Sequence, residues 1–239
     1  IRFFIRIFYK KADCIISNSK DLAKNLKKEF NLKKIKVIYN GYELKRIEKL
    51  SFDEPFQNFF HNKKVIIAVG RLSYEKGLDI LIKAFKLVRK KFECELIILG
   101  EGPLKKILLK LSKDLNLEND IHFLGYQKNP YPYIKRSDLF VLPSLIEGLP
   151  GALIQALILN KNIISTDCDF GPREILKNGK LGKLIPIKDK KRLAQEIINE
   201  LNNPSPIKNQ IDLDLERFIM KNIVKKYNLL FKELTKPTI

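Results

Sequence analysis

The chain has few of the residues that cross-link proteins or bind metal ions. Its 239 residues include three cysteines, two histidines, one methionine and no tryptophan. Cys14, Cys94, Cys168, His61 and His122 all lie far apart in the sequence. This spacing excludes a disulfide framework and a zinc ligand set. We therefore expect a reducing, cytoplasmic setting.

Long hydrophobic runs are also missing. No apolar run approaches the roughly 20 residues that a membrane-spanning helix needs, and no signal-peptide pattern opens the chain. Hydrophobic residues still make up 45% of the sequence, which indicates a globular protein with one large domain or two smaller ones. The first residue is Ile1 rather than methionine, so we expect a further N-terminal part.

Acidic residues are scarce relative to basic ones. The 27 Asp and Glu residues stand against 46 Lys and Arg, a net charge of +19. This excess suits an anionic partner, either a lipid surface or a nucleic acid. The lysines are spread along the whole chain, as a general compositional bias would spread them. Both interpretations remain open, and we predict no nucleic-acid partner.

The first eleven residues, IRFFIRIFYKK, predict an amphipathic basic helix. Arg2, Arg6 and Lys10 stand four residues apart, with aromatic and aliphatic residues between them. Such a helix can lie on an anionic bilayer, which would make the protein peripheral on the inner face of the membrane. It can equally pack against a further domain.

The rest of the sequence alternates short apolar runs with helical patterns. Strands are predicted at Cys14–Ser17, Lys36–Tyr39, Val65–Val69, Glu95–Leu99, Ile121–Leu124, Leu139–Leu142, Ile163–Ser165 and Gly182–Ile185. Helices are predicted from about Ser19, at Leu78–Phe92, Leu104–Leu115, Tyr131–Arg136, Pro150–Leu159, Pro172–Leu176 and Lys190–Leu201, and from about Leu213 to Leu234. This alternation predicts an α/β fold with a doubly wound parallel sheet, which binds ligands at the carboxyl ends of its strands. The segment Glu43–Asn62 shows no clear periodicity and is predicted to be a linker.

The most informative stretch runs from Phe140 to Glu174. Its predicted helix is apolar on every side except at Gln155, so it should be buried. Side chains lean toward a helix's N-terminus, so Gln155 should point toward the loop that holds Glu147. Free amides and the helix dipole at Pro150 favour an anion there. The alternative is a buried glutamine that bonds backbone groups and a solvated glutamate.

Other loops that follow strands carry charged and small residues. Arg71 and Lys76 lie five residues apart between two glycines, where they would bring positive charge to the sheet edge; the alternative is a solvated turn. The run from Gly100 to Pro103 is too short to be a dinucleotide fingerprint. Asp167 and Asp169 flank one residue, and without a third ligand nearby we predict no metal.

Together these motifs resemble a known family. From Val65 to Leu201 the chain is similar to the C-terminal, donor-binding domain of the retaining family-4 glycosyltransferases, which have the GT-B fold. The resemblance rests on GRLSYEKG, LGEGP, FLGY, DLFVLPSLIEGLPGALIQAL and STDCDFGPREIL. The motifs ADCIISNS and KIKVIYNGY resemble the end of that fold's N-terminal, Rossmann-like domain. The implied domains are residues 1–42, the end of the acceptor-side domain; 43–62, a linker; 63–203, the donor domain; and 204–239, a helical tail.

The resemblance also implies roles for individual residues. Arg71 and Lys76 would hold the diphosphate of a nucleotide-sugar donor, and Glu147 would contact the transferred sugar. The family has a second glutamate eight residues later, where this chain has Gln155. An amide offers the ribose hydroxyls one acceptor oxygen instead of a carboxylate, so donor affinity should be lower. The other positions predicted to bind the donor are Gly70, Gly102, Tyr126, Gly148 and Leu149.

The implied reaction is hexosyl transfer to a hydroxyl of a glycan or lipid-linked acceptor, with retention of configuration. Cations would replace the divalent metal used by other glycosyltransferase folds, and no cofactor beyond the donor substrate is expected. The alternatives are a GT-B nucleotide-sugar epimerase and a non-catalytic basic module that binds a nucleotide or a membrane surface. We also expect residues 1–239 alone to bind donor but transfer poorly. The sequence leaves the base, sugar, linkage and acceptor open.

Overall fold

A computed structural model describes residues 2–54, 63–206 and 215–235. Its larger part is a six-stranded sheet in which every pair of neighbours is parallel, in the order β5-β4-β3-β6-β7-β8. The strands are β3 (Lys64–Val69), β4 (Cys94–Leu99), β5 (Ile121–Gly125), β6 (Leu139–Leu142), β7 (Asn162–Thr166) and β8 (Lys183–Ile185). The predicted α/β, doubly wound parallel sheet is confirmed.

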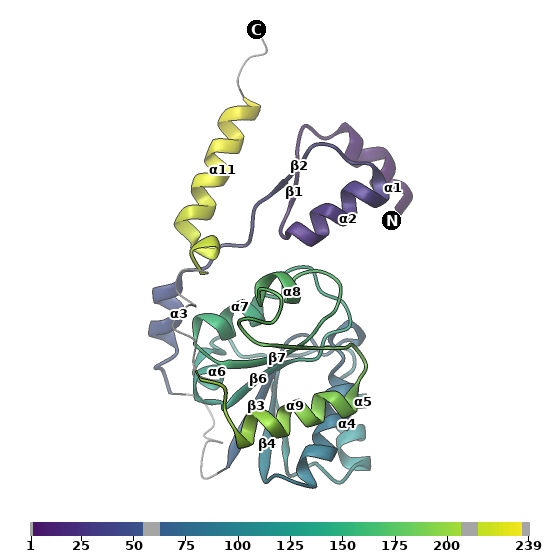
Figure 1. Cartoon of the computed structure of the whole chain (residues 1–239), viewed down its shortest axis with the longest axis vertical. Helices are drawn as coiled ribbons and strands as arrows, with labels where there is room; N and C mark the ends of the chain where they lie inside the picture. Colours follow the sequence, from purple (N-terminus) through teal and green to yellow (C-terminus); the bar gives the residue numbers. More distant parts are fainter. Residues whose placement is uncertain (1, 55–62, 207–214, 236–239) are drawn as a thin grey trace.

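Helices cover both faces of this sheet (Figure 1). They are α4 (Leu78–Arg89), α5 (Lys105–Asp114), α6 (Tyr131–Arg136), α7 (Gly151–Ile158), α8 (Pro172–Ile175) and α9 (Lys190–Asn202). Alternate residues of β3 enter different cores: Ile66 belongs to the core shared with α4, α5 and α9, and Ile67 to the core shared with α6, α7 and α8. Burial on both faces explains why these strands are almost continuously apolar.

The strand order reverses between β3 and β6. The chain moves outward through β4 and β5 on one side, then returns to the sheet centre and moves outward through β7 and β8 on the other. In doubly wound folds, ligands bind at the carboxyl ends of the strands near such a reversal. Most of the predicted site residues lie in the loops that follow these strands.

A smaller parallel pair precedes the six-stranded body. Strands β1 (Ile15–Ser17) and β2 (Ile35–Val37) pair in parallel and are joined by α2 (Lys20–Phe30). Ser19 caps α2, because its side chain accepts a hydrogen bond from the Leu22 amide at 3.2 Å. This strand-helix-strand unit is what a remnant of a second Rossmann-like domain requires, and in Figure 1 it lies beyond α7 and α8.

The N-terminal helix is shorter than predicted. Helix α1 spans Arg2–Phe8 and is followed by a 3-10 turn, η1 (Tyr9–Lys11). The rings of Phe4 and Phe8 are exposed and stack on each other with centroids 5.9 Å apart. Among the described residues, no helix combines the length and apolar character needed to cross a bilayer.

The predicted linker 43–62 does not lack structure throughout. Helix α3 spans Leu44–Leu50, and Ile47 is buried in the core that includes α6 and α7. The helix is only two turns long, so its apolar spacing is too brief to register as periodicity. Asn129 also donates to the Leu50 carbonyl at 2.9 Å. Residues 55–62 lie outside the described part of the chain.

The C-terminal helix begins later than predicted. A 3-10 turn, η3 (Glu216–Phe218), leads into α11 (Met220–Leu234), whereas Leu213 lies outside the described residues. Ile223 and Leu230 of α11 bury their side chains in the same core as α7. Figure 1 shows α11 beside the β1-β2 unit, so the end of the chain returns toward its start.

Candidate functional site

A cavity of about 580 Å³ opens at the carboxyl ends of β3, β4 and β5. Its lining includes four of the predicted site residues, Gly70, Arg71, Tyr126 and Gln155. The remaining lining residues are Val69, Leu99, Gly100, Glu101, Gln127, Lys128, Pro130 and Tyr131. A cavity at this edge of a doubly wound sheet is where such folds bind ligands.

The floor of the cavity depends on a close approach of two glycines. Gly100 has a positive φ of 135°, and a methyl group added there would lie 2.0 Å from the Gly70 carbonyl oxygen. The Gly70 amide donates to the Leu99 carbonyl at 3.0 Å, which holds the two loops together. No larger residue fits at position 100, so backbone rather than side chain forms this wall.

Gly102 is placed differently from the prediction that it binds the donor. A methyl group there would lie 2.4 Å from the Leu72 carbonyl oxygen. Gly102 is absent from the cavity lining. Its small size lets the loop after β4 pack against Leu72, and the Leu104 amide donates to that same carbonyl at 2.9 Å.

Lys76 and Glu147 form an ion pair beside the cavity, with Nζ and Oε1 2.7 Å apart. The Ser144 hydroxyl donates to the same carboxylate oxygen at 2.6 Å. The Glu147 side chain is only 6% exposed and that of Lys76 is 23% exposed. The stem of Lys76 lies over Gly70, 3.6 Å from where a methyl group on that glycine would be. The pair is therefore separated from the cavity by one glycine.

Two backbone contacts bring these distant residues together. The Leu145 amide donates to the Glu75 carbonyl at 2.7 Å, which ties the loop after β6 to the loop after β3. Gly77 adopts a left-handed conformation, with φ of 59°, and a methyl group there would lie 2.3 Å from the Pro143 carbonyl oxygen. The start of α4 can thus approach the end of β6 only because residue 77 is glycine.

The sequence predicted that Gln155 and Glu147 face one crevice. The structure places Gln155 in the cavity wall with Arg71, whereas Glu147 pairs with Lys76 on the other side of Gly70. The predicted burial of α7 is confirmed, because Leu153, Ile154, Ala156, Leu157 and Ile158 are buried while Gln155 is half-buried. The site is thus two adjoining groups of residues.

Arg71 differs from Lys76 in forming no ion pair with the described residues. It is exposed at the cavity rim, and within the described residues its side chain makes no hydrogen bond or ion pair. Its charge helps to hold the pKa of Glu75 below the ordinary value, behind larger effects from the Ser73 hydroxyl and a backbone hydrogen bond. A guanidinium in this position can take a bidentate anion without first losing another contact.

The last two predicted positions, Gly148 and Leu149, lie in the loop just before α7. Leu149 is buried in the core. Gly148 lies where the N-terminal unit meets the six-stranded body, and the Asn18 amide group is 4.0 Å from where a methyl group on Gly148 would be. The Gly148 carbonyl lies 2.8 Å from a methyl group built on Gly171, just before α8. Gly148 is therefore a contact point between three segments.

Asp167, the first of the acidic pair after β7, already has an ion-pair partner. Arg173 donates from Nε to Asp167 Oδ1 at 3.0 Å and pairs with the other carboxylate oxygen as well. Cys168 between the two aspartates is buried, and burial together with the charge of Glu147 raises its pKa to about 11. Over residues 2–54, 63–206 and 215–235, no group of three or more His, Cys, Asp or Glu side chains is placed to hold a metal ion. Metal independence itself stays a prediction.

Comparison with protein families places this site in context. A family model described as glycosyl transferases group 1 matches residues 51–213, and a second, described as glycosyltransferase family 4, matches residues 1–46. The chain belongs to the group 1 glycosyl transferases. The site residues from Gly70 to Gln155 all lie inside the first match.

Curated relatives agree with the family models. The chain is 45% identical over 177 residues to an uncharacterized glycosyltransferase of Methanocaldococcus jannaschii, covering 72% of this chain and 44% of the relative. It is 34% identical over 196 residues to the N-acetylgalactosamine-N,N'-diacetylbacillosaminyl-diphospho-undecaprenol 4-alpha-N-acetylgalactosaminyltransferase of Campylobacter jejuni, covering 81% of this chain and 52% of that enzyme. The chain thus spans about half the length of these relatives.

Solved structures show the same fold. The Anabaena protein HepE in complex with UDP and glucose superposes with a TM-score of 0.83 at 22% identity, over 98% of this chain and 68% of that one. The predicted GT-B type fold is confirmed. At this level of identity the likeness concerns the fold alone.

Several cavity residues of this glycosyl transferase were missed by the sequence analysis. Gln127, Lys128 and Tyr131 follow β5, and Gln127 donates to the Leu124 carbonyl at 2.7 Å. Burial raises the pKa of the Tyr131 hydroxyl. All three lie directly after a strand, so the rule that ligands bind at carboxyl ends would have found them had it been applied to β5 as it was to β3.

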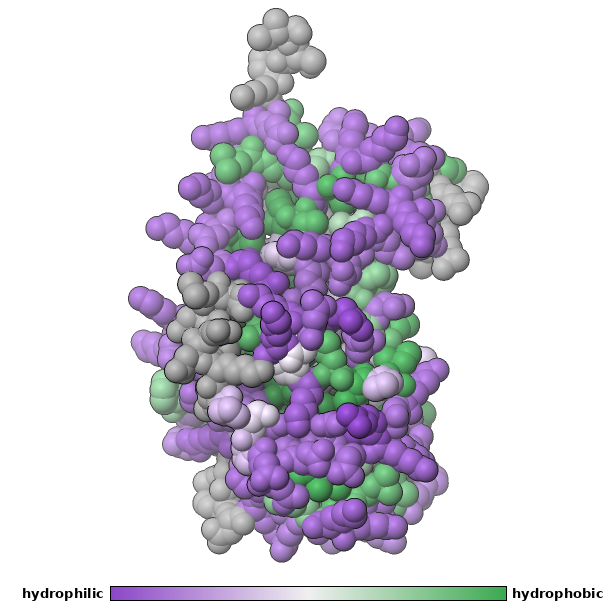
Figure 2. Space-filling model, viewed as in Figure 1, coloured by the Kyte–Doolittle hydropathy of each residue, from purple (hydrophilic) through white to green (hydrophobic). Residues whose placement is uncertain are grey.

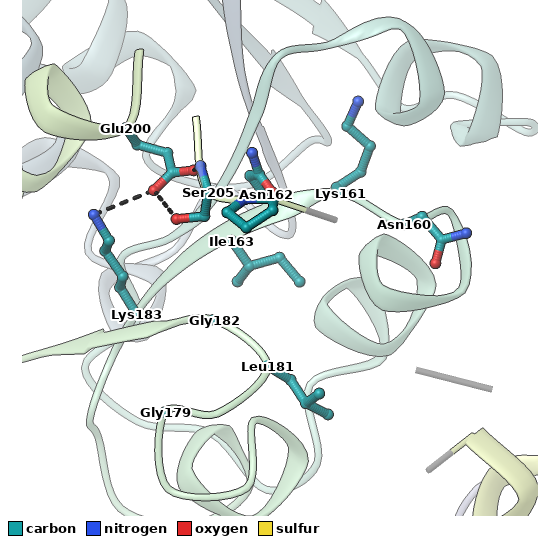
Figure 3. Close-up of a pocket in the computed structure, with 11 residues that line it drawn as sticks. Asn160, Lys161, Asn162, Ile163, Gly179, Leu181, Gly182, Lys183, Glu200 and Ser205 are labelled. Carbon is teal, nitrogen blue, oxygen red and sulfur yellow. Dashed lines mark hydrogen bonds and ion pairs between the residues drawn. The ribbon is translucent and has the colours of Figure 1, made fainter. Parts of the chain in front are cut away.

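A further hollow of about 250 Å³ lies at the opposite edge, where β7 and β8 begin (Figure 3). Glu200 accepts from the Ser205 amide at 2.6 Å and from its hydroxyl at 2.9 Å, and its carboxylate lies 3.2 Å from Lys183 Nζ. These contacts fix the turn by which the chain leaves α9. None of the predicted site residues lines this hollow.

Proposed function

We propose that this chain provides the donor-binding part of a retaining, metal-independent hexosyltransferase of family 4. It would transfer a sugar from a nucleoside diphosphate sugar to a hydroxyl of a glycan or lipid-linked acceptor. The observation that carries the proposal is the cavity that Arg71 and Gln155 share at the reversal of strand order, with the Lys76–Glu147 pair directly beside it. Residues 63–203 would form the donor domain and residues 1–42 part of the acceptor side.

The cavity has the features that a nucleoside diphosphate needs. Tyr126 and Tyr131 offer apolar ring surface, and Gln155 offers an amide for the ribose hydroxyls. Arg71 stands at the rim with its charge unpaired among the described residues, so it would take the diphosphate. The HepE complexes with UDP and glucose and with UDP-glucose support a nucleotide-sugar donor.

The proposed chemistry needs no protein nucleophile. The acceptor oxygen attacks the anomeric carbon on the face from which the diphosphate leaves, the carbon–diphosphate bond breaks, and the acceptor proton passes to the departing diphosphate oxygen. Arg71 and Lys76 would stabilise the negative charge that develops on that oxygen. Glu147, oriented by Ser144 and Lys76, would hold the sugar.

The other two functions find less support. A nucleotide-sugar epimerase could use the same cavity, but neither family model nor curated relative points to one. A non-catalytic module would bind a nucleotide or a membrane surface without transferring a sugar, and both family models are of glycosyl transferases instead. We further propose that the protein works on the cytoplasmic side, where the exposed Phe4 and Phe8 of the basic helix α1 could touch an anionic membrane surface.

The test is to add UDP, GDP and ADP to the chain and to measure binding by calorimetry and the melting temperature by thermal unfolding. We expect one of them to bind and to raise the melting temperature, and Arg71→Ala to weaken that binding by tenfold or more. Arg192→Ala is the control, since Arg192 lies on α9 and pairs with Glu196 away from the cavity.

No binding of any nucleoside diphosphate at millimolar concentration would favour the non-catalytic module. A nucleotide sugar that carries the bound nucleotide is then tested. If the protein converts it to a different nucleotide sugar without acceptor, the epimerase is the better assignment. Release of free nucleotide only when an acceptor is added would support transfer. The anomeric configuration of the product then decides between retention and inversion.

A further inference from the structure

A basic hollow of about 420 Å³ lies where α2 meets α8, on the other side of Gly148 from the nucleotide cavity. Six cationic side chains line it: Lys20, Lys24, Arg173, Lys177, Lys180 and Arg217. The other lining residues are Asp21, Glu174 and Asn178. Figure 2 shows hydrophilic residues covering the region between α2 and α8. We call this feature the basic hollow.

The two carboxylates of the basic hollow do not neutralise it. Glu174 accepts hydrogen bonds from the Lys20 amide at 2.9 Å and from the Tyr39 hydroxyl, so its carboxylate is turned into the first turn of α2. Asp21 lies 3.9 Å from Lys24 in an exposed pair, and such pairs contribute little. Asp167, outside the lining, pairs with Arg173. Six cations then stand against three carboxylates, so the local charge remains positive.

The cations come from three separate segments. Lys20 and Lys24 lie on α2, Arg173 to Lys180 on α8 and the turn after it, and Arg217 on η3. Arg217 is held in place, because it donates to the Glu174 and Ile175 carbonyls at 3.2 and 3.0 Å and its guanidinium carbon lies 4.7 Å from the Phe218 ring centroid. A long stretch of sequence thus converges on one positive site.

The basic hollow adjoins the Glu147 loop. Gly148 contacts Gly171, the residue before α8, and Gly148 also faces Asn18, two residues before Lys20. Gly70 and Lys76 thus connect the nucleotide cavity to Glu147 by contacts. The loop that holds Glu147 in turn contacts the segment before α8, which lines the basic hollow. The donor would occupy the nucleotide cavity, and the basic hollow is a separate place for a second ligand.

We propose that the basic hollow binds the phosphate or diphosphate group of a negatively charged acceptor. This inference rests on the proposed function and narrows it, because a neutral glycan would need no such cluster of cations. A phosphate ester carries one or two negative charges and several acceptor oxygens, which lysine ammoniums and arginine guanidiniums bind well. A group held there would place the linked hydroxyl near Glu147.

The experiment compares two double variants by calorimetric titration with inorganic pyrophosphate. Lys20→Gln/Lys24→Gln removes two charges from the basic hollow, and Lys190→Gln/Lys191→Gln removes two exposed charges from the start of α9 as a matched control. UDP at saturating concentration fills the nucleotide cavity, so pyrophosphate must bind elsewhere. We expect the first variant to bind pyrophosphate about fivefold to tenfold more weakly than wild type, the effect of losing two exposed ion pairs, and the control to bind as wild type does.

A second arm keeps this test independent of the nucleotide assignment. In an Arg71→Ala background without UDP, the same difference between the two double variants is expected. Failure of UDP to bind would then count against the proposed function alone. Equal weakening in both double variants, or no pyrophosphate binding by wild type, would overturn the basic hollow as a phosphate site.

A third arm distinguishes an acceptor phosphate from a lipid headgroup. Sedimentation with phosphatidylglycerol vesicles should be the same for both double variants. If Lys20→Gln/Lys24→Gln loses vesicle binding while its pyrophosphate affinity is unchanged, the basic hollow serves a membrane surface and the acceptor assignment is wrong. With a phosphate-bearing acceptor, the variant should raise the acceptor KM and leave the donor KM unchanged.

Discussion

Lys76→Ala should lower the free energy of unfolding, whereas Arg71→Ala should leave it almost unchanged. Both are predicted to bind the diphosphate, yet only Lys76 has a buried partner in the structure. Lys76→Ala leaves the Glu147 carboxylate, 6% exposed, with the Ser144 hydroxyl as its one side-chain partner among the described residues. Arg71→Ala removes an exposed group that makes no side-chain contact within the described residues.

The expected sizes follow from this difference. Removing one partner of a buried ion pair costs 3–5 kcal/mol, and the remaining Ser144 hydrogen bond should keep the cost of Lys76→Ala near the lower end, at about 3 kcal/mol. For a chain of this size that lowers the melting temperature by roughly 6–12 °C. Arg71→Ala should change the unfolding free energy by less than about 0.5 kcal/mol, as surface substitutions do.

Arg71→Ala should, however, reduce the stabilisation that UDP binding provides. At a UDP concentration of 100 times the wild-type Kd, binding adds about 2.7 kcal/mol to the stability of wild type. A hundredfold weaker Kd in Arg71→Ala would reduce that gain to about 0.4 kcal/mol. The variant would thus be as stable as wild type without ligand and clearly less stable with it.

The assay is urea unfolding monitored by circular dichroism, with and without UDP. It compares wild type, both alanine variants and Glu147→Gln. Glu147→Gln should lower the free energy of unfolding by only about 1 kcal/mol, because Lys76 is 23% exposed and its ammonium group can still reach water. If Lys76→Ala proves no less stable than Arg71→Ala, the buried ion pair is absent and the geometry of this part of the site is wrong.

Three further predictions concern other residues. Gln155→Glu should tighten nucleoside diphosphate binding about threefold to thirtyfold, because a charged acceptor binds hydroxyls more strongly than a neutral one; calorimetry that shows no gain would argue against a ribose contact. Burial lowers the pKa of Lys161 to about 8, below that of an unfolded lysine. The protonated form of Lys161 therefore destabilises the folded state. Lys161→Met should therefore stabilise the protein most below pH 8, and the gain should shrink as the pH rises toward 10, as measured by urea unfolding across that range. Glu174→Gln should weaken the carboxylate contacts with the α2 amides and the Tyr39 hydroxyl. Burial and then Glu174 raise the pKa of Tyr39, so the variant should lower it in an ultraviolet titration and speed hydrogen exchange at Lys20 and Asp21. Unchanged exchange at these amides would mean that Glu174 does not cap α2.

Much of the fold was readable from the sequence. The inner strands β3, β4, β6 and β7 are short apolar runs that are largely buried, and the helices between the strands carry apolar residues at helical spacing. Local pattern is therefore enough to place them. The helix that holds Gln155 is the clearest case, because a single polar residue among apolar ones predicted a buried helix, and the structure shows its apolar residues buried. Helix α3 escaped notice, since two turns of Leu44–Leu50 carry too little periodicity to be recognised.

The sequence by itself determined which residues follow the strand ends: Arg71 and Lys76 after one, Glu147 after another. Only the tertiary structure decided which of them meet. Lys76 reaches Glu147 across 71 residues because Gly77 and the Glu75 carbonyl hold the two loops together, whereas Arg71 faces the cavity with Gln155. The basic hollow likewise joins α2 to α8 and η3, elements that no local pattern connects. The physical reason is that hydrophobic periodicity specifies single elements, while contacts between loops depend on how those elements pack.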